Sequence, residues 1–160
     1  MQSYTIGQAA RLLGVSPDTA RRWADAGRVV THRDEVGRRL INGRDLAAFS
    51  VEVGQGAHAE DAEPYTSARN AFPGIVAFSV EVGQGAHAED AEPYTSARNA
   101  FPGIVTAVRL GDVCSQVDIQ AGPHRLVSLL TREAAEELGL EVGMRATARV
   151  KSTSVHVDRA

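Results

Sequence analysis

The stretch Ser96-Ala97-Arg98-Asn99-Ala100-Phe101-Pro102-Gly103-Ile104-Val105 decides how this chain is organised. A polar quartet, which carries a hydroxyl and a guanidinium, runs directly into an apolar segment that favours a β-strand. The same ten residues stand at 67–76, within a longer repeat in which residues 48–76 are identical to residues 77–105. We therefore expect one small domain before the repeat and another that the second copy opens.

The repeat is not typical of a solenoid, because solenoid repeats diverge in sequence and usually number three or more. A recent duplication, deliberate engineering and a sequence-assembly artefact all explain two identical copies, and these alternatives stay open. Residues 71–76 and 100–105 compete for one strand, and we expect the second copy to fill it because only that copy continues into 106–110. Residues 50–93 are predicted to be a duplicated flexible linker with a spare strand copy, in which 51–53 form a short strand and His58 and His87 are solvated.

Charge is distributed unevenly along the chain, whose net charge is −3. Residues 1–47 contain eight arginines and five acidic residues, so they carry +3 and the remainder carries −6. A basic head on an acidic body predicts that the head contacts an anion such as a nucleic acid. The single cysteine excludes an intramolecular disulfide, and neither a signal peptide nor a membrane-spanning apolar run is recognised, so a cytoplasmic location without membrane contact is predicted.

Helix signals dominate residues 1–49. Thr5 and Gln8 have the spacing of a capping box, and Gly14 suits the end of the helix that they begin. Ser16-Pro17 provides an N-cap and a first helical residue for a second helix over 17–26. Trp23 is spaced to face inward and is predicted to belong to the core rather than to stack on bases. Two short helices around a tight turn predict a helix-turn-helix motif.

Residues 29–41 are predicted to form a β-hairpin wing with three arginines, and 42–49 a turn and a short closing helix. The segments TIGQAARLLGVSPDTARRWADAGRV and GRRLINGRDLAAF resemble the MerR-like winged helix-turn-helix family. The resemblance implies binding to double-stranded DNA, with the second helix in the major groove and the wing on the flanking backbone or minor groove. The DNA-binding residues that it implies are Thr19, Arg21, Arg22, Arg38 and Arg39. The long dimerising helix usual in that family is not predicted here.

The remaining residues alternate between apolar and polar positions over 101–110, 113–120, 125–130, 144–151 and 154–157. Thr131 is predicted to cap a short helix over 132–138. Five short strands with one helical turn predict a small barrel of the oligonucleotide/oligosaccharide-binding (OB) type. The expected fold class is thus α+β, a winged helix-turn-helix followed by an OB-like barrel.

Three segments in this region, TSARNAFPGIV, LLTREAAEELGLEVG and ARVKSTSVHV, resemble the molybdate-binding Mop domain, also called the TOBE domain, and place it at 94–160. The resemblance implies a barrel that pairs with itself and binds molybdate or tungstate at subunit interfaces. A tetrahedral dianion needs several hydrogen-bond donors. Thr131, at a helix N-terminus, and Lys151, the sole lysine, are suited to bind such an anion. Ser67 and Arg69 of the first copy could take the oxyanion-binding roles of Ser96 and Arg98 in the second copy. The implied oxyanion-binding residues are Ser96, Arg98, Thr131, Lys151 and Ser152.

The two resemblances together predict a molybdate- or tungstate-responsive transcriptional regulator that forms a homo-oligomer, a dimer or a multiple of dimers. A molybdate or tungstate storage or buffering protein of higher oligomeric state is the alternative. A DNA architectural protein whose Mop-like domain only oligomerises is a third reading. No paired acid and base, Gly-rich phosphate loop or cation-binding cluster is recognised, so neither an enzyme nor a cationic metal site is predicted.

Overall fold

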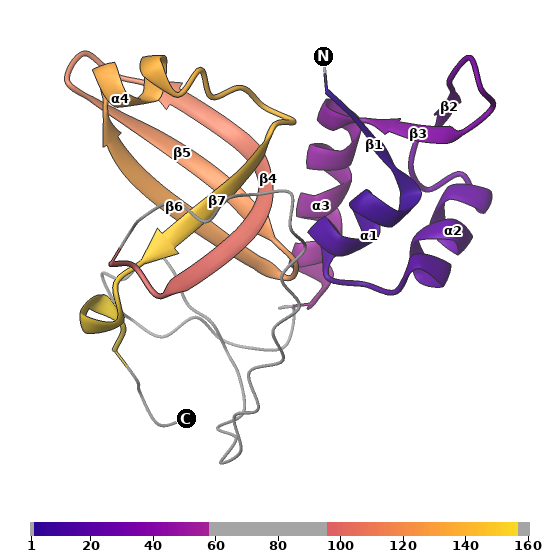
Figure 1. Ribbon diagram of the computed structural model, residues 1–160, viewed down its shortest axis with the longest axis horizontal. Helices are drawn as coiled ribbons and strands as arrows, with labels where there is room; N and C mark the ends of the chain where they lie inside the picture. The colour runs from indigo at the N-terminus through magenta and orange to yellow at the C-terminus, as the bar shows by residue number, and fades with distance from the viewer. Residues whose placement is uncertain (1, 58–95, 157–160) are drawn as a thin grey trace.

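The computed structural model describes residues 2–57 and 96–156, which form two lobes side by side (Figure 1). We call residues 2–57 the head and residues 96–156 the half-barrel. The head combines three helices with a small three-stranded sheet, and the half-barrel is a four-stranded antiparallel sheet that curls around its own core. The predicted α+β class is confirmed.

The head begins with strand β1 (Ser3–Thr5), which leads directly into helix α1 (Ile6–Leu13). The predicted capping box is present, because the Thr5 hydroxyl accepts from the Gln8 backbone N–H while the Gln8 side chain accepts from the Thr5 N–H. Gly14 ends the helix in the left-handed conformation, with φ of 68°, which only glycine adopts at little cost.

Helix α2 (Pro17–Asp25) follows with Ser16 as its N-cap, as predicted. Its inward face buries two alanines, and Trp23 is half-buried with its ring edge-to-face on Phe49 at a centroid distance of 5.3 Å. The prediction that Trp23 packs in the core is confirmed. Strands β2 (His32–Arg33) and β3 (Arg39–Asn42) form the predicted wing, and β3 also pairs with β1 to give the order β1-β3-β2.

Helix α3 (Gly43–Ala57) is longer than the short closing helix that the sequence predicts. The strand predicted at 51–53 is wrong, and residues 50–57 of the predicted linker are helical. Tertiary contacts explain the difference: Val53 packs against the head core, and Glu52 accepts a 2.7 Å hydrogen bond from Arg28. Gly54 passes so close to the Gln120 side chain that a Cβ atom would clash with it, so packing outweighs the low helix propensity of glycine.

The half-barrel contains strands β4 (Asn99–Leu110), β5 (Cys114–Ala121), β6 (His124–Thr131) and β7 (Arg145–Val150) in the order β6-β5-β4-β7. Helix α4 (Arg132–Glu137) follows β6, and Thr131 is its N-cap, as predicted. The first half of β4 pairs with β7 over Asn99–Ile104, and β5 pairs with Ile104–Leu110, with a bulge between Val105 and Ala107. Strand β4 is therefore the element that joins the two sides of the sheet.

The second copy of the repeat fills β4, as predicted. The first-copy strand at 71–76 lies outside the described residues, as do Ser67, Arg69, His58 and His87. The last predicted strand is wrong over 154–156, because Ser152–Ser154 forms a 3-10 turn, η1, in which the Val155 N–H donates to the Ser152 carbonyl. Consecutive short hydroxyl side chains favour turns, and here that preference overrides the alternating pattern.

The two lobes meet through neighbouring residues of β4. Ile104 is fully buried and belongs to the head core, together with Tyr4, Leu12 and Leu46. Val105 is also fully buried but belongs to the half-barrel core with Val117 and Ile119. Successive residues of a strand point to opposite faces, so β4 contributes to both cores.

Candidate functional site

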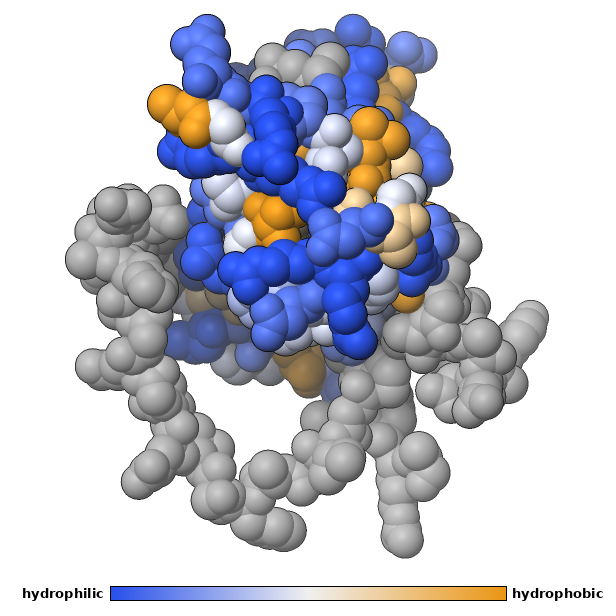
Figure 2. Space-filling model, turned by 90° about the vertical axis from the view of Figure 1, so that its right-hand side faces the viewer, coloured by the Kyte–Doolittle hydropathy of each residue, from blue (hydrophilic) through white to orange (hydrophobic). Residues whose placement is uncertain are grey.

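The predicted DNA-binding residues lie on α2 and the wing, on the side of the head turned away from the half-barrel (Figure 1). Arg21, Arg22 and Arg38 are exposed, and Thr19 and Arg39 are partly buried. Figure 2 looks onto this side of the molecule, where hydrophilic residues cover most of the surface and hydrophobic ones lie between them. The structure thus places α2 and the wing, which carry the five residues, on one side of the head.

Three of the four arginines in this group are held by acidic residues of the head. Arg21 pairs with Asp18 at 2.7 Å, and Arg39 pairs with Asp25, which links the wing to the end of α2. Arg38 pairs with Asp34 at 2.7 Å within the wing turn. These exposed pairs are weak individually, and their main effect is to orient the guanidinium groups in the absence of an anion.

Asp34 organises the wing turn through several hydrogen bonds. Its carboxylate accepts from the Arg38 side chain and from the backbone N–H groups of Val36 and Arg38. Desolvation would raise the pKa of Asp34, but the hydrogen bonds and charge of Arg38 outweigh it and lower that pKa below its usual value. The carboxylate that bonds to the turn before Arg39 is therefore charged at neutral pH.

Arg22 differs from the other three arginines. Within the described parts of the chain, no carboxylate lies within ion-pairing distance of its guanidinium. An incoming phosphate would therefore gain this charge without displacing an internal partner.

Four of the five predicted oxyanion-binding residues lie together at one end of the β4–β7 pair. Asn99 pairs with Val150, so Arg98 before β4 lies beside Lys151 after β7. The Asn99 side chain donates a 3.2 Å hydrogen bond to the Val150 carbonyl and holds the two ends together. Ser96 lies two residues before Arg98 in the chain and Ser152 directly follows Lys151, and all four residues are exposed.

Thr131 lies elsewhere. It pairs with Cys114 at the opposite end of the sheet, and its hydroxyl accepts from the Ala134 N–H as the cap of α4. The twelve-residue strand β4 separates the two ends by about 36 Å if extended at 3.3 Å per residue. Within one chain Thr131 does not share a site with Lys151, so it would meet the other four residues only across two chains.

One charged cluster in the half-barrel was not predicted. The buried Asp118 carboxylate accepts from Arg125 at 2.6 Å, Gln116 at 2.8 Å and Arg109 at 3.3 Å. Burial raises the pKa of Asp118, but these donors outweigh burial and hold the pKa below its usual value. The donors come from three adjacent strands, and only the strand register would have revealed the cluster from sequence. Its compensated charge and surroundings indicate a structural role.

Family comparisons agree with this division into two lobes. Residues 3–49 match the family model described as a helix-turn-helix domain, and residues 95–157 match that of the TOBE domain. The chain carries a helix-turn-helix domain at its N-terminus and a TOBE domain at its C-terminus. The head thus contains the helix-turn-helix domain and the half-barrel contains the TOBE domain. The MerR-like subtype stays a prediction.

Two solved structures are similar to the TOBE region. A molybdate-binding protein from Sporomusa ovata is 28% identical, with a TM-score of 0.40 over 41% of this chain and 97% of that chain. MopII from Clostridium pasteurianum is 36% identical, with a TM-score of 0.39 over 41% of this chain and 98% of that chain. A comparison with curated protein sequences gives no match.

No helix within 2–57 or 96–156 is both long and apolar enough to cross a membrane. The same ranges contain no group of three or more His, Cys, Asp or Glu side chains placed to bind a metal ion. The absence of enzymatic activity and the cytoplasmic location stay predictions.

Proposed function

We propose that this protein is a one-component transcriptional regulator that binds double-stranded DNA through its helix-turn-helix domain and molybdate or tungstate through its TOBE domain. The observation that carries the proposal is the fusion of these two domains in one chain. A storage protein needs no DNA-reading surface, whereas this head presents arginines on its outward face.

The DNA-binding part of the proposal follows from the geometry of the head. Helix α2 is exposed along the side that carries Arg21 and Arg22, and the wing extends beside it with Arg38 and Arg39. An exposed helix of this kind fits the major groove, while wing arginines suit the flanking phosphates. Since the half-barrel packs on the other side of the head, it leaves this face open.

The oxyanion-binding part rests on the TOBE match and on the donors at the end of β4–β7. Arg98 and Lys151 offer two cationic groups, and Ser96 and Ser152 offer hydroxyls to the oxygens of a tetrahedral dianion. All four are exposed in one chain, so a second chain is expected to close the site and contribute further donors, Thr131 among them. This arrangement supports a homo-oligomer, a dimer or a multiple of dimers.

Titration calorimetry with molybdate and tungstate, and with sulfate as the control anion, tests the ligand. Heat with molybdate or tungstate but none with sulfate is expected, and Lys151→Ala should abolish it. Absence of any heat would refute the oxyanion-binding part.

Selection from a random duplex library, followed by binding at several salt concentrations, tests the DNA-binding part. Arg22→Ala should weaken binding and reduce the salt slope by about one unit, since one phosphate contact is lost. Arg132→Ala, which removes an equal charge from α4, is the matched control and should leave the slope unchanged. If the wild type has no salt-sensitive DNA affinity with or without molybdate, a storage protein becomes the better reading.

A further inference from the structure

The head and the half-barrel are in direct backbone contact at two places. Gly14, in the turn between α1 and α2, meets Gly122 in the β5–β6 turn. Gly43, at the start of α3, meets Gly143 in the turn before β7. We call the surface that contains these two contacts, together with the approach of Gly54 to Gln120, the seam.

At the Gly43–Gly143 contact no space is left for a side chain, and the Gly14–Gly122 contact is tight at Gly14. A Cβ atom on Gly43 would lie 3.0 Å from the Gln2 carbonyl oxygen and 3.1 Å from the Gly143 carbonyl carbon, and it would clash with the Gly143 oxygen. A Cβ on Gly14 would lie 3.2 Å from the Gly122 Cα. Backbones this close have no flexible side chains between them that could repack as the lobes slide.

Hydrogen bonds between described residues of the two lobes cross the seam. The buried Tyr4 hydroxyl donates to the Gly143 carbonyl at 2.8 Å, and the Arg145 N–H donates to the Gln2 side chain at 3.3 Å. The Gly122 N–H donates at 3.0 Å to the Leu12 carbonyl, one of the last carbonyls of α1. A residue of the TOBE domain therefore completes the end of the first helix of the helix-turn-helix motif.

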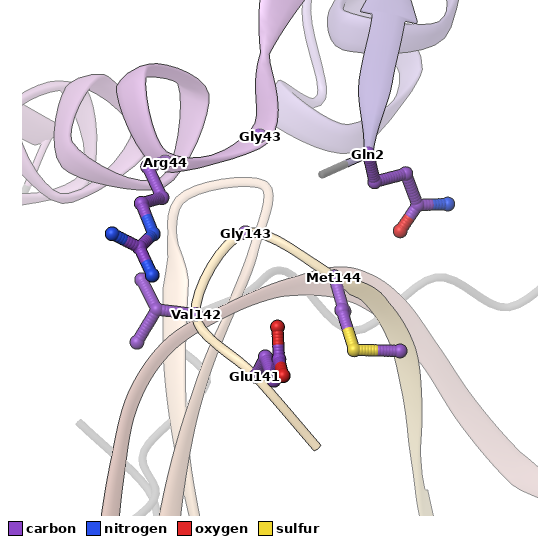
Figure 3. A pocket seen from close by; sticks show the side chains of 7 residues that line it. All are labelled: Gln2, Gly43, Arg44, Glu141, Val142, Gly143 and Met144. Carbon is purple, nitrogen blue, oxygen red and sulfur yellow. The ribbon is translucent and has the colours of Figure 1, made fainter. Parts of the chain in front are cut away.

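A small cleft of about 230 Å³ lies where the start of α3 crosses the turn before β7. Figure 3 shows Gly43 above Gly143, with the side chains of Arg44 and Gln2 to either side of this contact. The cleft thus lies beside a closed contact and does not separate the lobes. Ile104 fills the interior of the seam from β4.

The strands that enter the seam are the ones that carry the proposed oxyanion site. Strand β4 has Arg98 before its first residue and Ile104 in the seam, and β7 has Lys151 after its last residue and Arg145 in the seam. Ligand at the free end of this strand pair therefore acts on a sheet whose other end is fixed to the head.

We propose that the head and the half-barrel of one chain move as a single rigid body; the consequence for regulation rests on the proposed function. Oxyanion binding then regulates DNA binding by changing how two whole chains are placed against each other. A bistable element is needed for any such switch, and the seam, with its backbone contacts, is not one. The contact between chains is the place where the two arrangements differ.

Distance measurements between two spin labels in the full-length chain test this proposal. Cys114 is the sole cysteine and is exposed in the half-barrel, and Ala26→Cys adds an exposed label at the end of α2. Labelled chains are mixed with an excess of unlabelled chains, so that each measured distance lies within one chain. One narrow distribution that does not change with molybdate is expected. A broad distribution, or a shift with molybdate, would overturn the rigid-body proposal.

Wild-type protein labelled at Cys114 alone, without dilution, reports the distance between chains. This distance is expected to change when molybdate is added, and a constant value with bound molybdate would overturn the proposed mode of regulation. If molybdate does not bind at all, the proposed function fails. The width of the label-to-label distance distribution within one chain still tests the rigid-body proposal in that case.

Gly43→Ala provides a variant that disturbs the seam. Its added methyl group clashes across the seam, so the distribution within the chain should broaden. Gly7→Ala is the matched control, because Gly7 lies in α1 with nothing within 4 Å of an added Cβ, and it should leave the distribution unchanged. If Gly43→Ala does not fold, Tyr4→Phe removes only the hydroxyl that bonds to Gly143 and should broaden the distribution to a smaller extent. An unchanged distribution in every folded seam variant would count against the seam as the source of rigidity.

Discussion

Replacing Ile104 by alanine is expected to destabilise the head, although Ile104 belongs to a strand of the half-barrel. The side chain is completely buried and packs with Tyr4, Leu12 and Leu46 of the head. Truncating a buried isoleucine to alanine costs about 2–5 kcal/mol through lost burial and the cavity that remains. A value of about 3 kcal/mol, within that range, is expected. For a chain of this size it lowers the melting temperature by about 6–12 °C.

Trp23 makes the assay specific to the head. It is the sole tryptophan of the chain, and its ring packs on Phe49 in the head core, so its fluorescence reports unfolding of the head alone. The Trp23 unfolding transition of Ile104→Ala should move to lower denaturant, together with the transition seen by far-ultraviolet circular dichroism. Leu129→Ala removes a similar apolar group from β6 at a side chain that is 69% exposed, and it should change stability by less than about 0.5 kcal/mol. A Trp23 transition that stays in place in Ile104→Ala would refute the shared core.

Two further predictions concern the repeat and the buried carboxylate. Deleting residues 77–105 leaves the same chain as deleting 48–76, and that chain keeps a residue for every position described in α3 and β4. Its circular dichroism signal per molecule should therefore match that of the wild type, and so should the denaturant midpoint of its Trp23 unfolding transition. Loss of the β-sheet signal would contradict the conclusion that one copy of the repeat is enough to form both α3 and β4. Asp118→Asn should cost about 1–3 kcal/mol at pH 7, because two charged donors lose a carboxylate but are themselves partly exposed. The lowered pKa of Asp118 means that its stabilisation is present above the unfolded pKa of about 3.9 and is lost as the pH falls through the folded value. The difference in denaturant midpoint between wild type and variant should therefore shrink from pH 7 to pH 3, and a constant difference would contradict the assigned cause.

Features that depend on neighbouring residues in sequence could be predicted. The capping box at Thr5, the Ser16 cap of α2 and the Thr131 cap of α4 depend on side chains within three residues of the backbone groups that they bind. The apolar content of β4, β5 and β6 likewise marks them as strands, although β4 buries residues on both of its faces. Such local signals were enough for the fold class, for α1, α2, the wing and α4, and for strands β4 to β7, but not for β1.

Features that depend on contacts between distant residues could not be predicted. The extension of α3 to Ala57 runs through Gly54, a poor helix former that is tolerated because Gln120 occupies the space of a side chain. The seam has no local signature, since Gly14 and Gly43 also suit a helix end and a turn. The separation of Thr131 from Lys151 depends on the strand order, which alternation alone does not specify.

The identical copies of the repeat raise the question of why one contributes to a helix and the other to a strand. Helix α3 begins at Gly43, before the first copy, and β4 ends at Leu110, after the second copy. A helix that has already begun adds residues at little cost, because nucleation is its unfavourable step, so the copy directly after Gly43 is the one drawn into α3. Strand β4 needs both of its halves in one continuous segment, since β7 pairs with its first half and β5 with its second. Only the copy that is continuous with 106–110 supplies both halves in one strand. The residues that flank the repeat, rather than the repeat itself, therefore decide which copy enters each element.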